Sequence, residues 1–144
     1  AKESLTKIRE VVETLRGKET SPEMAIKTLV EEFSEKTGAE IELKIEGEMS
    51  NNYGVNSAIY HIVQEGMTNA IRHGNASKIW INLTYSNKNI KFSIKDNGAG
   101  AVAFIEGFGL KGIRERVESF GGKVEYKSQD GFVIDGIIQR KENV

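Results

Sequence analysis

Residues 62–73 carry the sequence IVQEGMTNAIRH, and this stretch decides how the middle of the chain folds. Apolar residues recur at helical spacing around it, which predicts one long helix from about residue 55 to residue 73, with Gly74 as its C-cap. Glu65 and Asn69 lie four positions apart, so they project within roughly 40° of each other on the helix surface. The predicted apolar stripe, well away from this pair, consists of Ile59, Val63, Met67 and Ala70.

The segments on both sides of this helix predict an α+β domain. Further helices are expected at residues 3–16, 22–37 and 110–120, the second with Ser21 as N-cap and Pro22 at its first position. Strands are expected at residues 41–45, 79–85, 90–94, 123–127 and 132–139, the last four as two hairpins. This order favours a two-layer α/β sandwich, in which a mixed, mainly antiparallel sheet is covered on one face by helices.

Composition excludes several classes of protein. The chain has 144 residues, 20 basic and 21 acidic, so its net charge of -1 argues against a broad nucleic-acid-binding surface. It has no cysteine and two histidines, which excludes a disulfide framework or thiolate nucleophile and disfavours a multi-histidine metal site. No apolar run approaches the ~18 residues of a membrane span. We therefore expect a soluble, cytoplasmic domain.

Two glycine-rich stretches could hold a ligand. Residues 96–100 (DNGAG) follow a predicted strand, and residues 107–112 (GFGLKG) lead into a predicted helix. Glycine lets the backbone approach a ligand closely, and the free N–H groups of a helix start favour an anion such as phosphate. The second stretch matches G-x-G-x-x-G, but a loop precedes it, so it is not the dinucleotide-binding fingerprint. Taken singly, these features also fit a turn, a flexible loop and a solvated helix face.

Taken in order, the three features resemble the ATP-binding domain of bacterial sensor histidine kinases in the GHKL ATPase superfamily. Residues 62–73 resemble the N box of the nitrate-sensor-like subgroup, 96–100 the G1 box, and 107–117 (GFGLKGIRERV) the G2 box. The resemblance implies the GHKL (Bergerat) fold. It also implies that residues 19–144 form the ATP-binding catalytic domain and that residues 1–18 end a dimerisation hairpin and its linker.

The resemblance assigns roles to individual residues. Asn69 would coordinate Mg²⁺ between the ATP phosphates, Glu65 would act as general base near the attacking imidazole, and Asp96 would bind the adenine amine. Residues 101–106 would form a short mobile lid. The other residues assigned to ATP binding are Gly98 and Gly100 at the adenine, Gly107, Gly109 and Leu110 at the phosphates, Arg72 as a further phosphate contact, and His73 lining the site.

The implied activity is transfer of the ATP γ-phosphate to a histidine on an upstream dimerisation domain that is absent from this chain. The phosphoryl group would then pass to a response regulator, which is a separate partner. The parent protein would be a homodimer anchored in the membrane. Neither nucleic acid nor membrane is expected to touch this domain. His61 and His73 both lie in the N-box helix, so neither matches the phosphoacceptor. A second departure is Phe132 after Gly131, where the family often has threonine near the adenine.

Two alternatives stay open on the sequence. One is a stand-alone serine kinase of the anti-sigma-factor type, which shares the superfamily boxes. The other is a nucleotide-responsive interaction module without turnover, which Glu65 disfavours because a pure binder does not need that carboxylate. A DNA-topology ATPase is less favoured, since it needs a large further domain.

Overall fold

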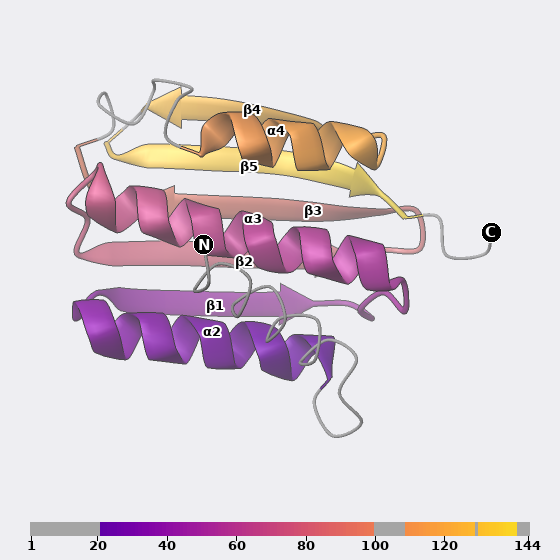
Figure 1. Cartoon of the computed structure of the whole chain (residues 1–144), viewed down its shortest axis with the longest axis horizontal. Helices are drawn as coiled ribbons and strands as arrows, with labels where there is room; N and C mark the ends of the chain where they lie inside the picture. The colour runs from indigo at the N-terminus through magenta and orange to yellow at the C-terminus, as the bar shows by residue number, and fades with distance from the viewer. Residues whose placement is uncertain (1–20, 100–108, 129, 141–144) are drawn as a thin grey trace, which may run out of the picture.

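The computed structural model describes residues 21–99, 109–128 and 130–140 (Figure 1). One five-stranded sheet has the order β1-β2-β3-β5-β4. The β1 and β2 strands pair in parallel, and every other neighbouring pair is antiparallel. The strands are β1 (Glu40–Glu46), β2 (Lys78–Tyr85), β3 (Asn89–Asp96), β4 (Lys123–Ser128) and β5 (Phe132–Gln139). The predicted mixed, mainly antiparallel sheet is therefore confirmed.

Three helices are described: α2 (Pro22–Thr37), α3 (Tyr53–Arg72) and α4 (Leu110–Ser119). All three lie on the same face of the sheet (Figure 1). This arrangement confirms the predicted two-layer sandwich. The helix predicted at residues 3–16 lies outside the described residues. No helix in the described ranges is both long and apolar enough to cross a membrane.

Local sequence explains where these helices begin and end. Ser21 caps α2 by accepting a hydrogen bond from the Met24 N–H, with Pro22 at the first position. Asn52 caps α3 in the same way, so this helix begins two residues before the predicted start at Val55.

The prediction of Gly74 as the C-cap of α3 is wrong. His73 occupies the cap, and the left-handed residue is Asn75, with φ of 51°. The N–H groups of His73 and Gly74 both donate to the Asn69 carbonyl, which widens the last turn and moves the reversal one residue along the chain. Asparagine tolerates this left-handed conformation better than most residues.

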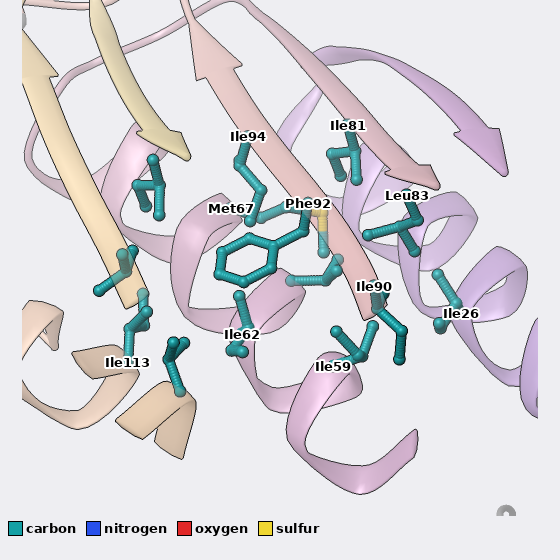
Figure 2. Packing of buried hydrophobic residues seen from close by; sticks show 14 of the residues in the cluster. Ile26, Ile59, Ile62, Met67, Ile81, Leu83, Ile90, Phe92, Ile94 and Ile113 are labelled. Carbon is teal, nitrogen blue, oxygen red and sulfur yellow. The ribbon is translucent and has the colours of Figure 1, made fainter. Parts of the chain in front are cut away.

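The core lies between the sheet and the helices. Alternate residues of β2 and β3 are buried, as expected for strands with one covered face. Figure 2 shows Ile62 and Met67 of α3 packed among Ile81, Phe92 and Ile94 of the sheet. The middle of α3 lies so close to the sheet that a Cβ at Gly66 would sit 2.6 Å from Ile94 Cδ1. The apolar stripe predicted for this helix is confirmed.

Candidate functional site

The predicted ligand-binding segments meet at one edge of the sandwich. The C-terminal end of α3, the end of β3, the beginning of α4 and the beginning of β5 all lie at the left edge in Figure 1. Hydrogen bonds and close backbone contacts join these ends to one another, although they are far apart in sequence. The candidate site therefore consists of these four ends.

Asn69 is the most unusual polar residue of this edge. Its exposed fraction is 3%, which excludes a solvated helix face at this position. The side-chain Nδ2 makes no hydrogen bond within the part of the chain that the structure describes. A buried amide without a partner is costly, so this nitrogen is available to a ligand. Half-buried Glu65 lies one turn earlier on the same face of α3.

Gly109 brings the start of α4 against this pair. It precedes the first residue of α4 with a left-handed φ of 85°, and the cap makes no side-chain hydrogen bond. A Cβ at this position would lie 2.3 Å from Glu65 Oε2 and 3.8 Å from Asn69 Nδ2. Glycine adopts this conformation without strain and leaves the space beside the two side chains free. Leu110 is fully buried through its side chain, so it can face a ligand only through its backbone N–H.

The chemistry of this pair fits a magnesium ion together with phosphates. Mg²⁺ prefers oxygen ligands, and it usually takes one or two from the protein and the others from phosphates and water. Glu65 places its carboxylate beside such an ion. Rotation of the Asn69 amide presents its oxygen instead of its nitrogen at nearly the same shape. Among the described residues, no group of three or more histidine, cysteine, aspartate or glutamate side chains could hold a metal ion by itself.

Asp96 forms a second polar centre, at the end of β3. Its exposed fraction is 5%, and its Oδ1 accepts hydrogen bonds from the N–H groups of Gly98 at 2.8 Å and Phe132 at 3.2 Å. Burial raises the pKa of Asp96, and these two hydrogen bonds offset part of that rise. No described residue bonds to Oδ2. This oxygen is therefore an acceptor that a ligand amine can use.

Backbone contacts tie the loop after β3 to the end of α3. The Ala99 N–H donates to the Gly74 carbonyl at 2.7 Å, and a Cβ at Gly98 would lie 2.3 Å from that same oxygen. Asn97 accepts hydrogen bonds from the N–H groups of Ser77 and Lys78 through Oδ1. Gly74 and Asn97 were not predicted as site residues, because their partners depend on the fold and cannot be inferred from local sequence.

The departure at Phe132 leaves Asp96 with its hydrogen bond. Phe132 begins β5, next to the last β3–β5 partner pair of Lys95 and Val133, and donates its backbone N–H to the Asp96 carboxylate. Its side chain is buried and stacks on Tyr126, with 6.1 Å between ring centroids. Gly131 approaches β3 so closely that a Cβ would lie 1.9 Å from the Asp96 carbonyl oxygen. Gly131 and Tyr126 were not predicted as site residues.

The remaining predicted residues differ in their positions. Arg72 is exposed in the last turn of α3, and half-buried His73 caps that helix. Gly100, Gly107 and the predicted lid at residues 101–106 lie outside the described residues. His61 lies half-buried on α3, edge-on to Tyr60. Burial lowers the pKa of His61, and the nearby charge of Arg116 on α4 lowers it further.

Comparison with known proteins identifies relatives of this chain. Residues 54–139 match the family model described as histidine kinase-, DNA gyrase B- and HSP90-like ATPase. Sensor histidine kinase LnrJ of Bacillus subtilis is 30% identical, in an alignment that covers 100% of this chain and 40% of that protein. Sensor histidine kinase YxjM of the same organism is 30% identical, with 89% and 32% covered. The chain thus spans well under half the length of these two relatives.

Solved structures share the fold. The histidine kinase AdeS of Acinetobacter baumannii has a TM-score of 0.63 at 19% identity, covering 85% of this chain and 65% of that one. The catalytic domain of the histidine kinase ThkA has a TM-score of 0.59 at 19% identity, with 83% and 92% covered. At this level of identity the likeness concerns the fold alone.

Proposed function

The chain belongs to the family of histidine kinase-, DNA gyrase B- and HSP90-like ATPases, and from that premise we propose that it is the ATP-binding catalytic domain of a sensor histidine kinase. The observation that carries this proposal is the meeting of Asn69, Glu65 and the start of α4 at one edge. Buried Asp96 lies at the end of the neighbouring strand. The named relatives support the kinase assignment.

In this proposal the two polar centres bind the two ends of ATP. Asp96 accepts the exocyclic amine of adenine through Oδ2, while Oδ1 stays engaged with the backbone. Gly98, together with Gly100 as the family resemblance implies, would shape the adenine pocket. The first N–H groups of α4, from Leu110 onward, hold the phosphates, because they have no partner within the helix. The family resemblance also implies that Arg72 contacts a phosphate and that His73 lines the site. Gly107 and Gly109, ahead of α4 in the sequence, would help to hold the phosphates.

Magnesium would be held by Asn69, with Glu65 beside it. The ion supplies charge neutralisation on the phosphates, which is a main requirement of phosphoryl transfer. Glu65 would accept the N–H proton of the attacking imidazole, or polarise that imidazole, in the role of general base. The chain's own contribution is positioning and electrostatics, since this reaction needs little covalent chemistry from the protein.

The phosphoacceptor in this proposal is a histidine of an upstream dimerisation domain. Residues 1–18 would end that domain and residues 19–144 would form the catalytic domain. The full-length protein would be a homodimer that passes the phosphoryl group to a response regulator. A membrane anchor, where the parent has one, would leave this domain in the cytoplasm.

Calorimetric titration with Mg²⁺-ATP, Mg²⁺-ADP and Mg²⁺-GTP tests the binding step. The wild type should bind the adenine nucleotides and not GTP, and Asp96→Ala should lose that binding. Asp135→Ala is the matched control, because Asp135 lies on β5 with its side chain 42% exposed and only a 3.9 Å ion pair to Lys127. A folded wild type that binds no adenine nucleotide would contradict the proposal.

Phosphoryl transfer is tested in the longer parent protein. Glu65→Gln should retain ATP binding and lose labelling of the upstream histidine. Acid-labile, base-stable phosphate on the wild type is the expected product. Labelling of a serine on a partner protein instead would favour the anti-sigma-type kinase, and ATP binding with no transfer at all would favour the interaction module.

A further inference from the structure

We propose that Tyr126 is a positioning residue for the phosphates of ATP. Its hydroxyl fixes the peptide group that presents the Lys111 N–H at the start of α4. This inference rests on the proposed function, because it assigns a role within that ATP site. It adds a residue that lies outside the three sequence boxes.

The geometry starts from one hydrogen bond. Tyr126, on β4, donates its hydroxyl to the Leu110 carbonyl oxygen at 2.5 Å. The Leu110 carbonyl and the Lys111 N–H belong to the same planar peptide unit and point in opposite directions. A bond that holds the carbonyl therefore also sets the direction of the N–H. A carbonyl that accepts a hydrogen bond also polarises its peptide, which makes the N–H a stronger donor.

The Lys111 N–H is one of the first N–H groups of α4, which have no partner within the helix. Gly109, two residues earlier, makes no side-chain cap bond and lies against Glu65 and Asn69. An anion beside these two side chains would therefore meet the N–H groups that Tyr126 orients. The Asn69 amide is 3% exposed and its Nδ2 has no partner among the described residues, which independently marks the same place as a ligand site.

The Tyr126 ring is held by its neighbours. It stacks on Phe132 with 23° between the ring planes, and the Arg114 guanidinium carbon lies 5.0 Å from its centroid. Phe132 in turn donates its N–H to Asp96. The ring pair thus connects the start of α4 with the carboxylate proposed to bind adenine. Removal of the hydroxyl alone should disturb only the α4 end of this connection.

Tyr126→Phe is the sharp test, because it keeps the ring and its stacking and removes one hydrogen bond. We expect Mg²⁺-ATP to bind roughly three- to tenfold more weakly, the loss of about one hydrogen bond. Adenosine, which has no phosphate, should bind within twofold of wild type. Binding is measured by NMR titration, which reaches millimolar dissociation constants, and the Lys111 amide resonance should shift in the free variant.

Tyr85→Phe is the matched control. Its hydroxyl is buried and makes no hydrogen bond within the described residues, so its removal should change neither ligand. If Tyr126→Phe leaves ATP binding unchanged, or weakens ATP and adenosine equally, the positioning role is overturned. If the wild type binds neither ligand, the proposed function itself fails, and that result is distinct from both others.

Discussion

Gly109 and Gly38 offer a paired test of the site, because they share a conformation and differ in surroundings. Gly109 precedes α4 with a φ of 85°, and Gly38 follows α2 with a φ of 76°. Both angles lie in the left-handed region. A Cβ at Gly38 would meet nothing within 4 Å, whereas a Cβ at Gly109 would lie 2.3 Å from Glu65 Oε2. Gly38→Ala therefore measures the backbone cost alone, and Gly109→Ala measures that cost together with displacement of the carboxylate.

The magnitudes follow from this difference. The left-handed conformation costs a residue with a Cβ about 1–2 kcal/mol, so both variants should lose that much free energy of unfolding. Glu65 ends in a flexible side chain, so it can swing away from the new methyl group at little further cost in stability. The methyl group would then occupy the space between Glu65, Asn69 and the start of α4. We expect Mg²⁺-ATP affinity to fall at least tenfold, equivalent to about 1.4 kcal/mol, in Gly109→Ala only.

Urea unfolding and calorimetric titration on the same samples measure the two effects separately. The expected pattern is a similar decrease in unfolding free energy for both variants, with wild-type ATP affinity in Gly38→Ala. Wild-type affinity in Gly109→Ala would refute the placement of the phosphates at the start of α4. An equal loss of affinity in Gly38→Ala would show that the loss reflects reduced stability rather than the site.

Four further predictions concern stability and specificity. Asp96→Asn keeps an acceptor for the two backbone N–H groups but replaces Oδ2 by an amide donor. Calorimetry should therefore show at least tenfold weaker binding of ATP. The preference should also shift toward ITP, whose base carries a carbonyl where adenine has its amine. Because burial raises the pKa of Asp96, the folded state keeps the Asp96 proton to higher pH than the unfolded state does. In urea titrations, the wild-type free energy of unfolding, relative to that of Asp96→Asn, should therefore fall as pH rises from about 4 through the raised pKa, and then level off. An equal pH dependence in both proteins would contradict this. Gly66→Ala should lose about 1–3 kcal/mol of unfolding free energy by overlap with Ile94, and Ile94→Val should restore part of it; full stability of the single variant would mean that α3 can move away from the sheet. Tyr85→Phe should leave thermal stability unchanged or slightly raised, because it removes a buried hydroxyl without a described partner, and a clear loss would reveal a partner.

Periodicity predicted the elements of this fold because the apolar residues of each covered face recur at short, regular spacing in the sequence. The alternation in β2 and β3 and the cap at Ser21 are local signals. The burial of Asn69 is not local. Helix geometry puts this residue on a polar edge, and in the fold Gly109 lies against it and the side chain is buried. The hydrogen bond of Tyr126 is equally hidden, since it depends on how the last hairpin lies beside the start of α4.

The substitution at Phe132 shows how a family motif can change without loss of the hydrogen bond to Asp96. Asp96 needs a hydrogen-bond donor from β5, and the structure supplies a backbone N–H, which every residue except proline carries. The side chain at position 132 therefore takes no part in this hydrogen bond. Here it is used for packing, by stacking on Tyr126, whose hydroxyl holds the first turn of α4. A threonine at this position would keep the bond to Asp96 but would lose the ring that supports Tyr126.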